Sequence, residues 1–459
     1  MSTDVEERNP VDDGSEGKSR GRRWGSCVMY ATGDTRLVYR RRTTINISME
    51  TFVATVMAGL IAVPSPISVS LTLGGAISLA LAPVTFPALW HNSRGRRLLI
   101  VALALVPVGW LTAQASLLQD TGRTFGVRIF LYEAALPVGL SASVVGAYWC
   151  ITKLGLQRFL LLAAIGLLAT ESLTYNPHNP WKYGLALPIS VLAILLFARN
   201  RLILGLVIAP LLIAVTIAAD YRSFTAILCI AWVLAIFART RGTLPSGSKV
   251  ASLAFVSVAA VVVVAQLIIQ ASTAGLLGEY LEKRTTDQLE VSNGNLILGG
   301  RAEWGGGIAL LRENPFGIGI GVGPSSDDYW LVIRNMPYSS QGLQEISGVA
   351  KYFHQGQVEL HSTFLTFWAV YGIAGVLFSI LVLTYVGHAT LVSLLTLGRP
   401  NLRAAVALLM LTAFWDILFS PTLVATLAIS LAAAIYILGK PNIDQIRTKD
   451  YKHEISTSY

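Results

Sequence analysis

Residues 98–118 read LLIVALALVPVGWLTAQASLL and are preceded by Arg94, Arg96 and Arg97. An apolar run of about 20 residues is long enough to cross the hydrocarbon core of a bilayer as a helix. Basic residues beside such a run are typical of its cytoplasmic end. This stretch therefore predicts a membrane-spanning helix whose N-terminal end faces the cytoplasm.

The composition of the whole chain agrees with that stretch. Of its 459 residues, 53% are hydrophobic and 13% are charged, and the mean hydropathy is +0.59. Soluble domains carry about 25% charged residues, so the composition excludes a disordered protein and a conventional soluble enzyme. Cys27, Cys150 and Cys229 fit neither a disulfide framework nor a zinc-binding spacing.

Similar apolar runs predict an all-α polytopic membrane protein with about 12 transmembrane helices. The predicted spans are residues 47–64, 67–89, 98–118, 127–149, 157–173, 182–198, 202–219, 223–238, 250–270, 362–396, 403–419 and 421–438. One long extracytoplasmic loop, 271–361, separates helices 9 and 10. The other divisions are a disordered cytoplasmic tail at 1–45, helices 1–9 within 46–270, helices 10–12 within 362–438 and a cytoplasmic tail at 439–459.

The basic connectors give the predicted orientation. With the N-terminus in the cytoplasm, the inner connectors hold only basic charges: Arg94, Arg96, Arg97, Lys153, Arg158, Arg199, Arg201, Arg239, Arg241, Lys249, Arg399 and Arg403. An even number of spans returns the C-terminus to the cytoplasm. The formal net charge of +9 therefore indicates topology in the cytoplasmic (plasma) membrane, and no nucleic acid partner is expected.

Charged residues within the predicted spans are candidates for function, because lipid makes them costly. They are Arg128, Glu133, Glu171, Asp220, Arg222 and Asp416, with His361 at the head of the tenth span. On the predicted topology, all of them lie towards the outer face. A transporter is expected to hold polar residues at the midplane. This distribution instead favours a cavity open to the outer face, where an enzyme would meet a lipid-anchored substrate.

Glycines recur in the predicted loop at Gly317, Gly319 and Gly321, after Asn314 and Pro315. The spacing is similar to that of a dinucleotide-binding turn, but no βαβ unit surrounds it. We expect these glycines either to let backbone segments pack tightly or to bring N–H groups close to an anion.

Four features, in the same order, resemble the O-antigen ligase and O-antigen polymerase family of bacterial membrane glycosyltransferases. They are Arg222 at an outer helix start; Arg301 and Trp304 at the start of the outer loop; Asn-Pro-x-Gly-x-Gly at 314–319; and His361-Ser362 before a helix with Gly372 and Gly375. The likeness covers about residues 200–400. Ser362 stands where members commonly have Asn.

This resemblance implies transfer or polymerisation of a glycan from a polyprenyl-diphosphate donor in cell-envelope polysaccharide biosynthesis. The reaction would occur at the outer face of the membrane, onto a glycan, lipid or cell-wall acceptor. It implies neither a cofactor nor an essential metal ion. The acceptor is not encoded in any motif, so ligase and polymerase remain alternatives.

Catalytic roles are expected for His361, Arg222 and Arg301. Arginines bind diphosphate oxygens through paired donors and stay charged in a low-dielectric site. His361 is expected to activate the acceptor hydroxyl, to hydrogen-bond the diphosphate or to protonate the leaving oxygen. Substrate-binding roles are expected for Arg128, Glu133, Glu359 and Trp304, and the two glutamates are also alternative bases.

Each of these residues also has a structural interpretation. Arg128 would pair with Glu133, Trp304 would pack or dip into the membrane, His361 would cap a helix, Lys182 would snorkel to the interface, and Asp327 and Asp328 would form a turn or cap. Two other functions are a transporter or flippase of lipid-linked or small anionic substrates and a scaffold for envelope synthesis.

Overall fold

The computed structural model describes residues 48–65, 70–119, 122–173, 179–197, 202–240, 266–292, 303–336 and 358–439, with positions 255, 259, 262–264, 294 and 301. The chain divides into two compact units, Met1–Ser48 and Met49–Tyr459. The predicted tail at 1–45, the predicted C-terminal tail after Gly439 and most of the predicted span 250–270 lie outside the described residues. So do residues 295–300 and 337–357 of the predicted loop.

Helices make up nearly all of the described second unit. They are α1 (Met49–Leu60), α2 (Leu73–Ala80), α3 (Ala82–Trp90), α4 (Ser93–Gln119), α5 (Val127–Leu154), α6 (Leu156–Leu173), the π-helix η1 (Trp181–Leu185), α7 (Ala186–Phe197), α8 (Leu202–Ala218), α9 (Arg222–Thr240), α11 (Glu279–Val291), α13 (Glu303–Glu313), α14 (Ser326–Arg334), α16 (Thr363–Thr396), α17 (Pro400–Phe419) and α18 (Val424–Gly439). The short strands β1 (Thr124–Phe125) and β2 (Val322–Gly323) pair antiparallel.

The described helices confirm an all-α protein with helices able to cross a membrane, but they support fewer spans than the sequence predicted. By length and composition, α4, α5, α16 and α17 qualify, and α2 with α3 would make a fifth span. Helices α1, α8 and α18 have 12, 17 and 16 residues. Each is shorter than the roughly 20 residues that a straight helix needs to cross the hydrocarbon core.

The predicted span at 67–89 is broken in the structure, because α2 and α3 are bent by 98°. Thr72 caps α2 by accepting the Gly75 N–H at 3.0 Å. The Thr85 hydroxyl donates to Ser78 O at 3.0 Å and holds the corner, and α3 has a proline in its first turn. Hydropathy is uniform across this corner, so an apolar-run search does not detect it.

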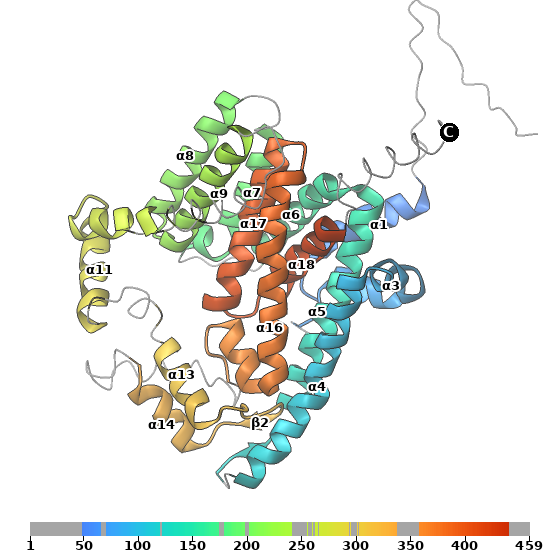
Figure 1. Ribbon diagram of the computed structural model, residues 1–459, viewed down its shortest axis with the longest axis vertical. Helices are drawn as coiled ribbons and strands as arrows, with labels where there is room; N and C mark the ends of the chain where they lie inside the picture. The colour runs from blue at the N-terminus through green and yellow to red at the C-terminus, as the bar shows by residue number, and fades with distance from the viewer. Residues whose placement is uncertain are drawn as a thin grey trace, which may run out of the picture. The chain divides into compact units, whose positions relative to one another are not determined.

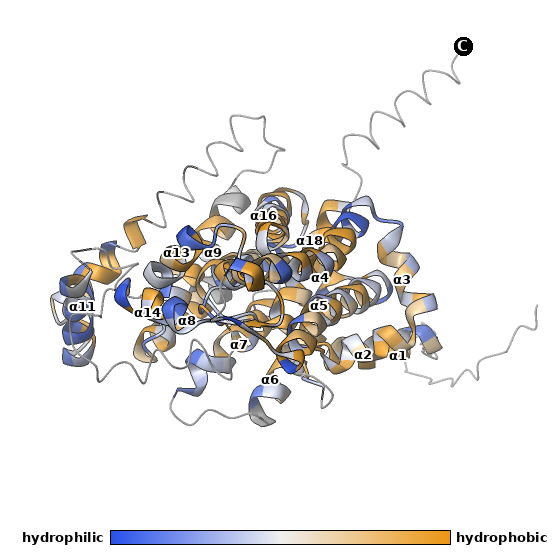
Figure 2. Ribbon diagram, turned by 90° about the horizontal axis from the view of Figure 1, so that it is seen from below, coloured by the Kyte–Doolittle hydropathy of each residue, from blue (hydrophilic) through white to orange (hydrophobic). Residues whose placement is uncertain are grey.

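The core lies where the long helices pack together. Helix α16 packs against α17, α4 and α18, while α5 packs against α18, α2 and α1 (Figure 1). Tyr371 and Phe367 of α16 are among the large side chains that are almost fully buried. These packed helices are largely orange in the hydropathy view, whereas α11 is largely blue (Figure 2).

Polar contacts gather the predicted inner connectors at one end of the packed helices. The Tyr385 hydroxyl donates to Arg94 O at 3.2 Å, and the Arg94 guanidinium donates to Leu438 O. Arg399 donates to the Gln157 side chain at 2.5 Å. The basic stretches near residues 157 and 399 therefore lie together, and the stretch near 94 lies against the last turn of α18.

The opposite end carries the segments that follow the predicted outer connectors. There β1, between α4 and α5, pairs with β2, between α13 and α14 (Figure 1). The Thr363 N–H at the start of α16 donates to Ser420 O, just after α17, at 2.9 Å. Most of the predicted site residues lie at this end.

Candidate functional site

Arg222 is held at the sharp turn between α8 and α9. Asp220 in this turn has φ +49°, in the left-handed region where Asp is one of the more tolerated residues. Arg222 Nε donates to Asp220 Oδ1 at 3.2 Å, and Nη1 donates to Thr285 Oγ1 at 2.7 Å. Nη2 is buried and has no hydrogen-bond partner within the described part of the chain. One strong donor of this guanidinium is therefore available for a ligand.

Three further cations lie around Arg222. Arg284 of α11 pairs with Asp220, and Lys182 of η1 is within the electrostatic reach of Arg222, Arg284 and Arg301. We call Lys182, Arg222, Arg284 and Arg301 the basic cluster. The sequence predicts an interfacial role for Lys182 and gives no signal for Arg284, because neither residue belongs to a motif.

Arg301 reaches the same place from the start of α13. Its guanidinium lies over the Trp415 ring at 5.8 Å from the centroid and 3.8 Å from the Glu303 carboxylate. Tyr221, next to Arg222, is within the electrostatic reach of both Arg301 and Asp416. The structure therefore brings the two predicted catalytic arginines together, and a cation–π contact holds Arg301 in place.

Trp304 supports the end of α17. Its indole Nε1 donates to Leu418 O at 2.9 Å, and its ring lies 5.5 Å from the Phe419 ring, centroid to centroid. The ring of Trp304 and its single side-chain donor, Nε1–H, thus both have protein partners. These contacts favour the packing interpretation of Trp304 over sugar binding.

His361 precedes α16 and has φ +46°, an uncommon conformation for a residue other than glycine. The helix cap is Ser362, whose Oγ accepts the Leu365 N–H at 3.3 Å. The start of α16 is bonded to Ser420, one helical turn after Asp416. His361 therefore lies beside the end of α17, where Trp415 contacts Arg301. The helix-cap interpretation of His361 is wrong, because Ser362 is the cap.

Glu133 has a structural partner in the glycine-rich sequence. Its Oε2 accepts the Gly321 N–H at 2.6 Å, and its backbone carbonyl accepts the Tyr371 hydroxyl at 2.6 Å. Arg128 is exposed, and within the described residues no ion pair joins it to Glu133. The interpretation of these two residues as an ion pair is therefore wrong.

Glu359 is exposed and within the electrostatic reach of Tyr132 on α5. This interaction places Glu359 near the α5 residue next to Glu133. The predicted set of seven residues therefore divides. Arg222, Arg301, Trp304 and His361 surround the end of α17, whereas Arg128, Glu133 and Glu359 belong to the α5 side.

The glycines adopt conformations that side chains rarely take. Gly317, Gly319 and Gly321 have φ of +85°, +100° and +78°. A Cβ at Gly319 would lie 2.2 Å from Ala113 N of α4. The first of the two predicted roles, close backbone packing, is confirmed. The Gly321 N–H donates to the side chain of Glu133, and anion binding by the glycines stays a prediction.

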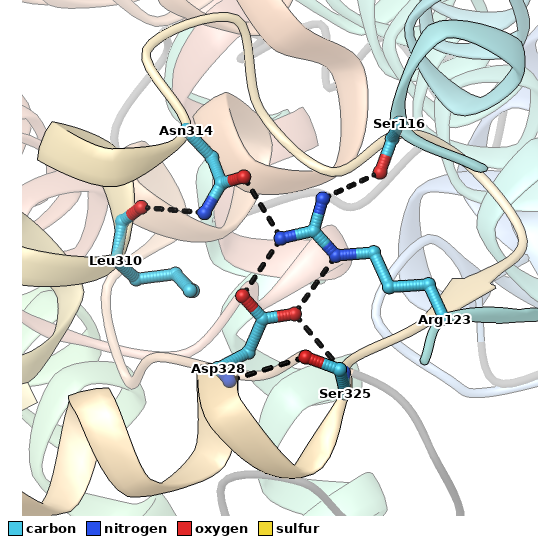
Figure 3. A network of polar contacts seen from close by, with 6 residues as sticks. All are labelled: Ser116, Arg123, Leu310, Asn314, Ser325 and Asp328. Carbon is cyan, nitrogen blue, oxygen red and sulfur yellow. Dashed lines mark hydrogen bonds and ion pairs between the residues drawn. The ribbon is translucent and has the colours of Figure 1, made fainter. Parts of the chain in front are cut away.

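A buried network fixes the α13–α14 segment, residues 303–336, to the connector between α4 and α5 (Figure 3). Arg123 donates to both Asp328 carboxylate oxygens, at 2.9 and 2.7 Å, to Ser116 Oγ at 2.8 Å and to Asn314 Oδ1 at 2.8 Å. The predicted cap role of Asp328 is confirmed by its capping box with Ser325. The pairing with Arg123 was missed, because 205 residues separate the partners.

The charge of Asp328 is stabilised despite its burial. Burial alone would raise the pKa of this carboxyl, but hydrogen bonds from Arg123 and Ser325 outweigh burial and hold the pKa below its usual value. Asp328 thus remains ionised and keeps its bidentate contact with Arg123.

Within the described residues, no group of three His, Cys, Asp or Glu side chains is placed to hold a metal ion. Comparison with known proteins adds no further assignment: no protein-family model and no curated protein matches the chain. The functional reading therefore depends on the basic cluster and the residues around the end of α17.

Proposed function

We propose that the protein is an O-antigen ligase-like membrane glycosyltransferase that uses a glycan carried on polyprenyl diphosphate. The observation that carries this proposal is the basic cluster, in which Arg222 has a buried donor without a partner among the residues that the structure describes. A diphosphate meets this arrangement with several acceptor oxygens and negative charge. The proposal includes about 12 spans, both termini in the cytoplasm and an extracytoplasmic loop at 271–361.

In the proposed reaction, an acceptor hydroxyl attacks the anomeric carbon of the donor glycan. The bond between that carbon and the phosphate oxygen breaks, and polyprenyl diphosphate leaves with the electron pair. Negative charge grows on the leaving diphosphate, so preorganised cations stabilise the transition state more than the ground state. Arg222 and Arg301 supply these cations, with Arg284 and Lys182 beside them.

His361 takes the acceptor proton in this proposal. A histidine suits this role because its ordinary pKa lies near neutral pH. The left-handed backbone conformation of His361 supports a functional role, since strained residues cluster at functional sites. The Asn that family members commonly have at the position of Ser362 would cap α16 equally well, so Ser362 is compatible with the resemblance.

A transporter or flippase of lipid-linked or small anionic substrates remains the second candidate. It is favoured by the broken helices, since discontinuous helices form the binding sites of many transporters. Helices α2 and α3 are bent by 98°, and α16 is broken at Gly372. However, the break in α16 faces the backbone of Phe316 and is therefore occupied by protein.

Deletion of the gene followed by separation of cell-envelope glycans tests the proposal. Loss of long chains with single repeats retained would identify a polymerase. Loss of acceptor attachment with accumulation of lipid-linked polymer would identify a ligase. An unchanged glycan profile would reject glycan transfer.

A further inference from the structure

The residues after α13 run between α4 and α16 without helical structure. We call residues 315–321 the glycine segment. The N–H groups of Ile318 and Gly319 both donate to Ala369 O of α16, at 2.7 and 3.0 Å, and the Ile320 N–H donates to Gly109 O of α4 at 3.1 Å. The glycine segment is thus bonded to two helices that are long and apolar enough to cross a membrane.

The partners of the glycine segment lie well inside these helices. Gly109 is near the middle of the apolar stretch 98–118, about 15 Å from either end at 1.5 Å per residue. Ala369 lies about 9 Å along α16 from Thr363. The segment therefore descends between the helices, and the chain returns to the connector between α4 and α5 at β2.

Irregular backbone at membrane depth requires that protein groups satisfy its polar atoms. Helix α16 provides an acceptor because Gly372, with φ 60° and ψ −140°, interrupts the helix near Ala369. Helix α5 provides another acceptor, the carboxylate of Glu133, for the Gly321 N–H. This contact accounts for a carboxylate that would otherwise be costly within a span.

One side chain of the segment continues an exposed apolar stripe. Phe316 is 74% exposed, and its carbonyl lies 2.4 Å from where a Cβ of Gly372 would stand. Directly after Gly372, α16 exposes Ile373, Leu377 and Ile380 at 53%, 56% and 49%. Their spacing of four and three residues places these side chains on one face of the helix. Phe316 is therefore continuous with a face suited to lipid.

We propose that the glycine segment is a re-entrant loop that enters the leaflet on the side of α13 and α14. Phe316 contacts phospholipid acyl chains there, together with the stripe Ile373, Leu377 and Ile380. The segment predicted to be part of an extracytoplasmic loop is thus partly embedded in the membrane. This inference does not rest on glycan transfer.

Depth-dependent fluorescence quenching tests the proposal in reconstituted liposomes. In full-length protein with Cys27, Cys150 and Cys229 replaced by serine, Phe316→Cys is labelled with an environment-sensitive fluorophore. Leu377→Cys is the lipid-facing control, and Asp327→Cys, at an exposed position of α14, is the water-facing control. Quenching by nitroxides on the acyl chains is compared with quenching by aqueous iodide.

The Phe316 label is expected to match the Leu377 label, with strong acyl-chain quenching and little iodide quenching. The Asp327 label should show the reverse. Iodide quenching at Phe316 equal to that at Asp327 would overturn the proposal. If the serine background does not fold, Phe316→Asp in the otherwise native sequence provides a second test. After extraction from the membrane, this variant should have a less ordered glycine segment than the native protein. An unchanged glycine segment would mean that Phe316 faces water and would overturn the proposal.

Discussion

Replacing Arg123 by alanine is expected to release the α13–α14 segment from the connector between α4 and α5. The side chains of Arg123 and Asp328 are only 4% and 6% exposed. Removing one partner of a buried ion pair costs about 3–5 kcal/mol, because the other charge is left buried without compensation. We therefore expect the free energy of local opening of the segment to fall by about 3–5 kcal/mol. Arg123→Lys should recover only part of it, since an ammonium cannot replace the bidentate contact.

Hydrogen exchange measured by mass spectrometry reads this local opening directly. A loss of that size lowers the protection of peptides from residues 303–336 by roughly two to four orders of magnitude, since each 1.4 kcal/mol is tenfold. Arg334→Ala is the matched control, because Arg334 lies on the same segment but is exposed. If Arg123→Ala and Arg334→Ala exchange equally fast, the network does not hold the segment.

Acid should weaken the same contact. The pKa of Asp328 in the folded protein lies below its unfolded value of about 3.9. The contribution of ionised Asp328 to folding stability is therefore present above that pH and is lost as the pH falls through the folded pKa. Asp328→Asn should remove this part of the acid dependence of the melting temperature. Gly319→Ala adds a Cβ 2.2 Å from a backbone nitrogen at a φ of +100°. It should lower the melting temperature strongly, whereas Gly387→Ala, with nothing within 4 Å, should leave it unchanged or raise it. Trp304→Phe removes the hydrogen bond to Leu418 O and should cost about 1 kcal/mol in an unfolding titration; an unchanged midpoint would show that this bond contributes nothing.

The long helices could be predicted from the sequence because lipid demands an uninterrupted apolar run. The run 98–118 lies within α4, and 403–419 lies within α17. The corner between α2 and α3 could not be predicted in this way. It depends on the Thr85–Ser78 contact and on the proline in the first turn of α3, neither of which changes the hydropathy.

The site was predictable only where a motif marked it. Arg222 and Arg301 could be selected from their sequence context, and the structure brings them together through the end of α17. Arg284 joins them because α11 packs its side chain onto Asp220. That placement is a tertiary contact without a sequence pattern.

Glu133 shows why an intramembrane charge alone does not identify a substrate ligand. The cost of a carboxylate in a span correctly indicated that it has a specific role. Its observed partner is the N–H of Gly321, so the described role is to satisfy the backbone of the glycine segment. Sequence alone gives no means of choosing between a backbone partner and a substrate.

The most direct test of the central claim is glycan transfer by the purified, reconstituted protein from a polyprenyl-diphosphate-linked donor. Arg222→Lys, Arg301→Lys and His361→Ala should each abolish transfer while the protein still inserts and keeps its melting temperature, because a lysine cannot reproduce the paired donors of arginine. Arg334→Lys, at an exposed position, should transfer normally. Near-normal transfer by the first three variants would contradict the assignment of the basic cluster and His361 as the catalytic site.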